Sequence, residues 1–146
     1  MKKLTLVFGV FLAFFASLAI AQNISSKPAV KYKTPELTVA QVDQWLAKPD
    51  QVLVIDIRRP DELITFGSFP VFLNVQFADL EKNIAYIPKD RSIITVSNHA
   101  NRAFAAGDLL SSKGYKVIGA AGSENYEQQG GKAVTKIQKP APKPAQ

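Results

Sequence analysis

The amino-acid sequence predicts an α/β fold in which a parallel sheet carries helices on both faces. Two continuous apolar, β-branched runs, 52–57 and 92–96, are typical of strands that are buried on both faces. Helix-like patterns alternate with these and with shorter strand-like runs over about 100 residues, and such alternation favours parallel strands joined by crossover helices.

The first half of the folded region is predicted to begin with a capped helix. Thr38 and Gln41 have the spacing of a capping box and predict a helix over 38–47. The strand over 52–57 follows, and a short helix over 60–66 starts at a proline, which suits a first helical turn. A brief strand and one or two helical turns come next, at 73–75 and 77–84.

The second half is predicted to repeat this alternation. After the strand over 92–96, an amphipathic pattern predicts a helix over 101–113, which ends at Gly114 as a C′ residue. Four side chains of this helix are predicted to face inward: Ala103, Ala106, Leu109 and Leu110. A further strand over 115–118 and a last helix over 123–129 complete the pattern.

The amino terminus has the features of a secretory signal peptide over 1–21. Lys2 and Lys3 precede an apolar run over 4–18, and Ala-Ile-Ala at 19–21 is a small-x-small cleavage site. We therefore expect export, to a periplasm or to the outside of the cell. An uncleaved membrane anchor is the alternative, although its apolar run would be short for a span of about 20 residues.

Three further segments follow the predicted signal peptide. A linker over 22–36 contains lysine and proline, a folded domain covers 37–134, and a tail over 135–146 is rich in proline, lysine and alanine and is predicted to be disordered.

Charge is distributed unevenly between the domain and its flanks. The flanks 22–33 and 132–146 carry seven lysines and no acid, whereas 34–131 carries nine basic residues against twelve acidic ones. The folded part therefore lacks the basic, aromatic-bearing face that nucleic-acid binding requires. Weak contact of the basic flanks with an anionic envelope surface is one interpretation, and solvated ends are the other.

A loop after the strand over 92–96 has the features of an anion-binding site. A strand-to-helix loop directs backbone N–H groups at its centre and adds the positive end of the helix, an environment that lowers the pKa of a thiol. The candidate residues are Ser97, Asn98, His99, Ala100, Asn101 and Arg102. Asp56 and Arg58 end another strand, so we expect them at the same rim of the sheet. The chain contains no cysteine.

These residues resemble the rhodanese-like domain family of single-domain sulfurtransferases. The resemblance covers about 37–134 and rests on the following residues in order: Val54 to Arg58, Asp61, Glu62, Gly67, the loop ending in Asn101 and Arg102, Leu109, Leu110, and Gly114 to Val117. It implies a parallel sheet of about five strands, with the active loop after the fourth. It also implies that the first loop residue is a cysteine that carries sulfur as a persulfide. Ser97 occupies that position.

Other positions depart from the family pattern as well. Ser68 stands where the resemblance implies a histidine, Ser123 where it implies the second of two glycines, Tyr126 where it implies a tryptophan, and Ala100 where it implies a glycine. Asp56, Arg58, Asn101 and Arg102 are retained, and the first two are expected to brace the loop by charge-assisted hydrogen bonds.

The sequence therefore predicts an exported, rhodanese-like protein that is inactive as a sulfurtransferase and binds a small oxyanion or a protein partner. One alternative is an ester or phosphoester hydrolase with Ser97 as nucleophile and His99 as base, although a direct bond between them is not expected in a tight loop. A structural adaptor of the cell envelope is the other alternative.

Single residues at the rim keep several interpretations. Ser97 is a cap of the loop, an anion contact or a nucleophile. Arg102 is expected to pair with one of three partners: a bound anion, Asp56 or Glu62. His99 is either an exposed loop residue or the base of the hydrolase. A lone histidine without cysteine argues against a zinc site, and the acidic residues lack the spacing of a calcium loop, so no cofactor is expected.

Overall fold

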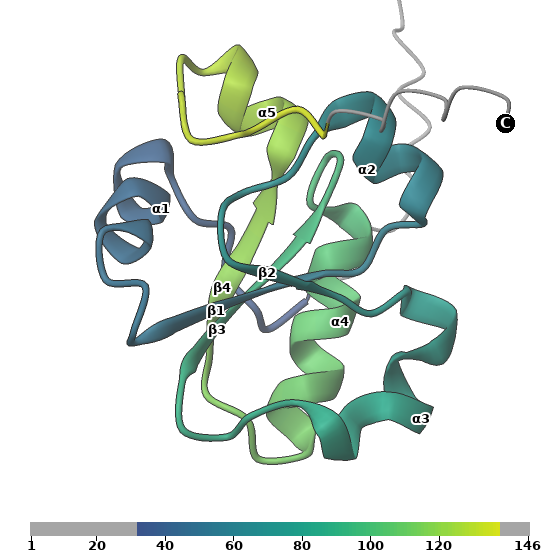
Figure 1. Cartoon of the computed structure of the whole chain (residues 1–146). Coiled ribbons are helices and arrows are strands. Elements are labelled where there is room, and N and C mark those ends of the chain that lie inside the picture. The colour runs from purple at the N-terminus through teal and green to yellow at the C-terminus, as the bar shows by residue number, and fades with distance from the viewer. Residues whose placement is uncertain (1–31, 138–146) are drawn as a thin grey trace, which may run out of the picture. The chain divides into compact units, whose positions relative to one another are not determined.

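A computed structural model describes residues 32–137 as an α/β domain built on one parallel sheet (Figure 1). The sheet has four strands in the order β2-β1-β3-β4, with the bounds β1 Val52–Asp56, β2 Phe72–Asn74, β3 Ser92–Ser97 and β4 Val117–Gly122. All three strand pairs are parallel. The predicted fold class is confirmed. The predicted signal peptide over 1–21 lies outside the described residues.

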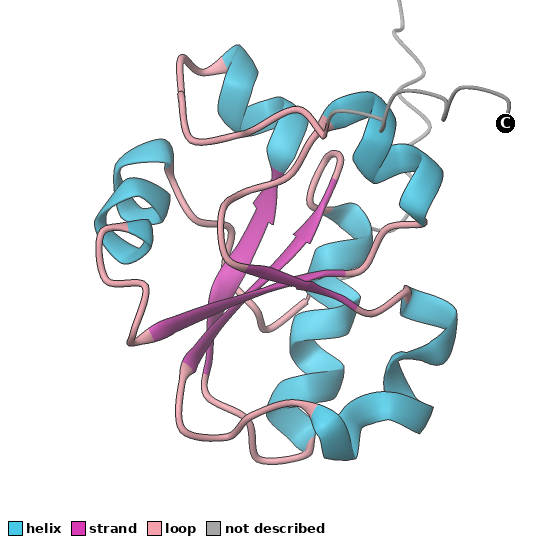
Figure 2. Cartoon of the chain, in the orientation of Figure 1, coloured by secondary structure: helices cyan, strands magenta, loops and turns pink. Residues whose placement is uncertain are grey.

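Helices cover both faces of this sheet, as Figure 2 shows. The α-helices are α1 Val39–Leu46, α2 Pro60–Phe66, α3 Leu80–Asn83, α4 Asn101–Ser112 and α5 Ser123–Gln128, and the 3-10 turns are η1 Phe77–Asp79 and η2 Ile84–Tyr86. Side chains from α3 and α4 pack with one apolar cluster, which includes Leu53, Ile55, Leu80, Ile93 and Leu110. The opposite cluster joins α1 and α5 to the sheet and includes Val42, Val54, Ile94, Val96 and Tyr126.

The apolar sequence of β1 from Val52 to Ile55 is explained by its position between two helical layers. Leu53 and Ile55 belong to the first cluster, and Val52 and Val54 belong to the second. Because successive side chains point to opposite faces, a strand between two helical layers buries every residue. All five residues of β1 are indeed buried, and the predicted strand over 52–57 is confirmed to within one residue.

The sheet has four strands rather than the expected five, so the predicted strand count was wrong. In the fifth position a single parallel bridge joins Glu36 to Ala120, at the free side of β4. Leu37 donates to the carbonyl of Ala120 (2.9 Å), and Ala120 donates to the carbonyl of Pro35 (2.8 Å). Pro35 lacks an N–H and therefore limits how far this pairing can extend.

The capping box that starts α1 is present as predicted. The N–H of Gln41 donates to Thr38 Oγ1 (3.3 Å), and the N–H of Thr38 donates to Gln41 Oε1 (2.9 Å). At the other end of the domain, α4 ends before Gly114, which has a φ of 82° and lies in the left-handed region that favours glycine. The start of α1 and the end of α4 therefore follow from sequence.

Two segments outside the main elements attach to the domain. Asp108 accepts hydrogen bonds from the N–H of Lys33 and from the N–H and hydroxyl of Thr34. Thr135 forms an isolated antiparallel bridge with Ser68. No helix among residues 32–137 is both long and apolar enough to span a membrane.

Candidate functional site

The candidate site lies where β1 and β3 end side by side. Asp56 pairs in register with Val96, so the polar residues that follow the two strands meet at the carboxyl edge of the sheet, as expected. Strand β3 includes Ser97, and α4 begins at Asn101, so the non-helical part of the loop is Asn98 to Ala100. The last two residues of the predicted loop, Asn101 and Arg102, already belong to the helix.

The turn into α4 depends on Ala100. This residue has a φ of 62°, is fully buried, and is the N-cap residue of α4 without a side-chain capping bond. Ser97 is 1% exposed and ends β3, so its hydroxyl does not cap the helix. The left-handed turn at Ala100 places the helix start three residues after Ser97, and the role of Ser97 as a cap of the loop, an anion contact or a nucleophile stays a prediction.

Several backbone N–H groups of the loop have no internal acceptor. The N–H of Asn101 donates to the carbonyl of His99 (2.8 Å) and the N–H of Phe104 to the carbonyl of Ala100 (3.0 Å). Within residues 32–137, no acceptor is found for the N–H groups of Asn98, His99, Ala100, Arg102 and Ala103. Ala100 and Ala103 are fully buried, whereas Asn98, His99 and Arg102 are at least partly exposed, so the N–H groups of these three are the candidates for an acceptor oxygen from a ligand.

A fully buried ion pair supports the loop from below. Asp56 and Arg58 are both 0% exposed, and Arg58 Nη2 lies 2.7 Å from Asp56 Oδ2. The Nη1 of Arg58 donates to Asn98 Oδ1 (2.8 Å) and to Ser123 Oγ (3.0 Å), and its Nη2 also donates to the carbonyl of Gly67 (2.7 Å). The guanidinium therefore connects β1 with the loop, with α2 and with α5.

The carboxylate of Asp56 likewise accepts several hydrogen bonds. Asp56 accepts from Arg58 Nε (2.9 Å) and from the hydroxyl of Ser68 (2.6 Å). No buried side-chain N or O atom in the described part of the chain lacks a hydrogen-bond partner. Burial of two charges without water is tolerated only with such complete pairing. The expected contact from Arg58 to the loop is made through Asn98.

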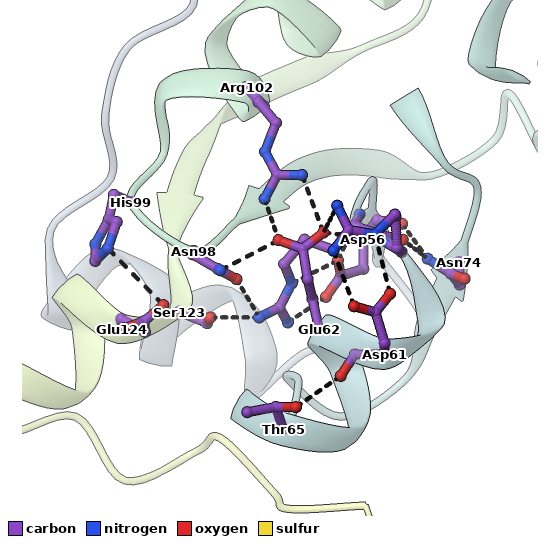
Figure 3. A network of polar contacts seen from close by, with 12 residues as sticks. Asp56, Asp61, Glu62, Thr65, Asn74, Asn98, His99, Arg102, Ser123 and Glu124 are labelled. Atoms are coloured by element: carbon purple, nitrogen blue, oxygen red, sulfur yellow. Dashed lines mark hydrogen bonds and ion pairs between the residues drawn. The ribbon is translucent and has the colours of Figure 1, made fainter. Parts of the chain in front are cut away.

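A second ion pair lies beside the loop (Figure 3). Helix α2 presents Glu62, whose carboxylate accepts from both terminal nitrogens of Arg102 (2.5 and 3.1 Å) and from Asn98 Nδ2 (3.2 Å). The hydrogen bond from Arg102 lowers the pKa of Glu62, and the same bond raises the pKa of Arg102. Of the three partners considered for Arg102, the structure shows Glu62. The carboxylate of Glu62 therefore already occupies the place beside Arg102 where a bound anion would pair with it.

His99 points away from the buried ion pair. Its side chain is 53% exposed, its Nε2 lies 3.8 Å from Glu124 Oε1, and its Nδ1 lies 3.0 Å from Asn125 Oδ1. No hydrogen bond joins His99 to Ser97 among the residues described. The two residues are therefore only two positions apart in sequence but are not arranged as a nucleophile and its base.

Gly122 is required by the loop although it carries no functional group. It pairs with Ser97 in the sheet, and a Cβ atom at this position would lie 2.8 Å from the carbonyl oxygen of Asn98 and 2.9 Å from the nitrogen of Ala100. Both contacts are with backbone atoms, which cannot move aside cheaply. Only glycine lets β4 pass this closely under the turn.

Sequence reasoning missed three of the residues that hold the site. Ser68 and Ser123 were identified only as departures from a family pattern, yet their hydroxyls bind Asp56 and Arg58. Asn98 was a member of the loop without a role, and it joins both ion pairs. No sequence signal marks these contacts, because they span between 12 and 65 residues along the chain. No cluster of three potential metal ligands occurs within 32–137.

Comparisons with known proteins agree with this geometry. The sequence model of the rhodanese-like domain matches residues 38–124. A curated sulfurtransferase of Allochromatium vinosum is 31% identical over 80 residues, which cover 55% of this chain and 74% of that protein.

Solved structures of rhodanese-like proteins have the same fold. A rhodanese-related protein of Thermoplasma volcanium superimposes with a TM-score of 0.61 at 25% identity, over 68% of this chain and 97% of that one. A rhodanese-like domain protein of Staphylococcus aureus gives a TM-score of 0.59 at 15% identity, over 71% of this chain and 99% of that one.

Proposed function

The chain belongs to the rhodanese-like domain family, and from this membership we propose that it is an exported binding protein that no longer transfers sulfur. The observation that carries the proposal is the absence of cysteine from the whole sequence, with Ser97 at the end of β3. A persulfide needs a thiol sulfur that forms and releases a sulfur–sulfur bond, and a hydroxyl oxygen cannot replace it.

The ligand that the loop supports best is a small oxyanion. The backbone N–H groups of Asn98, His99 and Arg102, which are at least partly exposed, have no acceptor in the described residues and lie at the start of the 12-residue helix α4. N–H groups at a helix start bind oxyanions whatever the side chains are. The carboxylate of Glu62 opposes this binding by repulsion, so the affinity is expected to be low while Glu62 is ionised.

The other functions considered from sequence have less support. A serine hydrolase needs a base in contact with Ser97, but that serine is almost completely buried and the ring of His99 faces Asn125. A protein partner at the rim or an adaptor role at the envelope stays a proposal that depends on export and on the basic flanks.

The loss of sulfur transfer is tested with purified protein, thiosulfate and cyanide. We expect no thiocyanate above the rate without protein, and a clear rate would refute the proposal. The variant Ser97→Cys is the matched comparison: thiocyanate formation by this variant alone would show that the loop geometry is intact and that only the sulfur atom is lacking.

Oxyanion binding is tested by thermal unfolding in sodium thiosulfate or sulfate against sodium chloride of equal ionic strength. We expect a small rise in the melting temperature for the natural chain and a larger rise for Glu62→Gln, because the competing negative charge is gone. Asp61→Asn is the control, since Asp61 is a neighbour on α2 that pairs with Arg59 and does not contact the loop. Equal melting temperatures in all salts for both chains would contradict oxyanion binding.

A further inference from the structure

A groove of about 380 Å³ lies away from the loop, between β2 and the segment of η1, α3 and η2. Its size falls in the range of sites that accept a side chain or a small ligand. The residues that define its chemistry are Leu73, Asn74, Val75, Asp79, Asn83 and Tyr86. None of them belongs to the loop or to its two ion pairs, so a ligand in this groove is independent of the proposed oxyanion site.

One wall of the groove is the edge of the sheet. Among the described residues, β2 pairs only with β1, and the N–H groups of Val75 and Phe77 donate to the carbonyls of Asp56 and Ile57. Since backbone groups alternate in direction along a strand, those of Phe72 and Asn74 point to the free edge. An extended segment can add to such an edge through main-chain hydrogen bonds.

Two amides of the groove keep their oxygens unpaired, Asp79 adds a carboxylate, and the amide of Gln76 offers both donors and an acceptor. The amide nitrogen of Asn74 donates to the carbonyls of Asp56 and Arg58 (both 2.8 Å), and that of Asn83 donates to the carbonyl of Asp79 (2.9 Å). Figure 3 shows the nitrogen of Asn74 directed at the buried network. The oxygens of both amides have no donor within the described residues, and they join the half-exposed carboxylate of Asp79.

The remaining walls suit an aliphatic chain that ends in a positive charge. Leu73 and Val75 provide apolar surface, and Tyr86 is 81% exposed, which leaves its ring free for a cation. Asp79 already pairs with Lys82, whose Nζ lies 4.0 Å away on a side chain that is 80% exposed. Such an exposed pair is weak and is easily replaced by a better placed cation.

We infer that this groove binds an extended segment of a protein partner and takes a lysine or arginine side chain of that segment between Asp79 and Tyr86. The free edge of β2 holds the main chain, the amide oxygens and Asp79 hold the charge, and Leu73 and Val75 contact the aliphatic carbons. The negative charge of Asp79, together with the two unpaired amide oxygens, is the argument for a cationic side chain over an acidic one.

The experiment measures fluorescence anisotropy of a dye-labelled peptide Thr-Val-Lys-Val-Thr with the full chain. We expect saturable binding that is at least about tenfold weaker for the same peptide with glutamine in place of lysine. Asp79→Asn and Tyr86→Ala should each weaken the lysine peptide severalfold. Glu81→Gln is the control, because Glu81 is a neighbouring exposed acid that pairs with Lys113 and does not line the groove.

Four results would overturn the inference. Equal binding of the lysine and glutamine peptides removes the cation site, and an equal effect of Glu81→Gln and Asp79→Asn reduces it to general charge attraction. Tighter peptide binding after joint substitution of Lys139 and Lys143 by glutamine identifies this chain's own tail as the occupant. Sedimentation that shows a dimer lost in Asp79→Asn identifies a second copy instead. Circular dichroism of each variant checks that it is folded.

Discussion

Among residues 32–137, Val71 is an exposed, non-glycine residue with a positive φ. Its φ is 55°, in the left-handed region that β-branched residues avoid, and 49% of the residue is exposed. We predict that Val71→Gly raises the free energy of unfolding by about 0.5–1 kcal/mol, as relief of this strain exceeds the entropy cost of glycine. Urea denaturation measures the change.

Ala100 provides the comparison for this substitution, because it has a φ of 62° but is fully buried. Ala100→Gly relieves the same kind of strain while it removes a buried methyl group, so we expect a smaller gain or a loss. A destabilised Val71→Gly would show that the side chain of Val71 makes a contact that outweighs the strain.

Glu62 makes stability depend on pH. Because Arg102 lowers the pKa of its carboxyl group, Glu62 contributes stability above the unfolded pKa of about 4.3 and loses it as the pH falls through the lower folded value. We predict that Glu62→Gln is less stable by about 1–2 kcal/mol at pH 7. The difference between the two chains should disappear in strong acid.

Denaturation of both chains between pH 7 and pH 2 provides the measurement. Asp61 and Asp108 also have lowered pKa values, so both chains lose stability in acid, and only their difference reports on Glu62. A difference that stays constant down to pH 2 would mean that the ion pair with Arg102 contributes nothing.

The sequence predicted the positions of some residues of the candidate site for a physical reason, and it did not decide the contacts of others. Asp56 and Arg58 were placed at the rim because parallel strands end at one edge, and the structure has them there. The partner of Arg102 was left among three choices, since the position of α2 over the loop follows from tertiary packing. The hydroxyls of Ser68 and Ser123 have no pattern that distinguishes them from other serines.

At the scale of elements, the contact between β4 and the loop sets a sharp limit on substitution. A methyl group at Gly122 would lie less than 3.0 Å from backbone atoms of Asn98, His99 and Ala100. We predict that Gly122→Ala lowers the free energy of unfolding by about 1–3 kcal/mol, as overpacking does in other cores. Thermal unfolding measures this loss, and amide exchange shows whether the loop is the part that yields.

Gly119 is the matched control in the same strand. A methyl group there would lie 2.6 Å from the side chain of Leu37, which can move more easily than backbone, and 3.0 Å from the carbonyl oxygen of Pro35, which is farther than the backbone contacts at Gly122. We therefore expect Gly119→Ala to cost less than Gly122→Ala. The reverse order would mean that the loop adapts and that its geometry is not fixed by β4.

Strand β4 also shows where sequence prediction of elements fails. The strand was expected over 115–118 from its bulky residues, but it runs from Val117 to Gly122. Its last four residues are Gly-Ala-Ala-Gly, which have weak strand propensity. Small residues are needed there because Leu37 and the loop approach closely, a tertiary constraint that propensity does not contain. Strands β1 and β3 were predictable because burial on both faces makes most of their residues apolar and β-branched.

At the scale of the whole molecule, the ion pair of Asp56 and Arg58 connects most of the elements around the site. We predict that Asp56→Asn lowers the free energy of unfolding by about 3–5 kcal/mol, because it leaves a buried guanidinium without its carboxylate. Joint replacement of both residues by leucine should cost less than the sum of the single leucine substitutions. Denaturant unfolding of the four chains of this cycle provides the test.

The exposed pair of Arg59 and Asp61 is the control for this cycle. Its side chains are 62% and 67% exposed, and solvent screens the charges, so its replacement should leave stability nearly unchanged. Additive costs at Asp56 and Arg58 would show that the two charges do not stabilise one another.

The overall architecture was predictable from sequence, whereas the groove beside β2 was not. Alternation of strands and helices determines a parallel sheet with two helical layers. The groove depends on which strand lies at the edge and on how the short turns after it fold back, and its residues spread from Leu73 to Ile87 without a periodic pattern. The expected fifth strand was likewise not predictable in its extent, because its position holds a single bridge between Glu36 and Ala120.

The bridge between Thr135 and Ser68 has a mechanical consequence. Thr135 is held by two backbone bonds to Ser68 (2.8 and 3.1 Å), and the hydroxyl of Ser68 holds Asp56. Lys136 is also bound, through Nζ, to the carbonyl of Phe66 (2.7 Å) and to Glu127 (3.2 Å). Tension applied to the chain beyond Ile137 would be shared between these contacts and the bridge, which leads to the buried carboxylate through one residue. We expect that a load applied at the carboxyl end would reach Asp56, which supports the loop through Arg58, before the two apolar clusters separate.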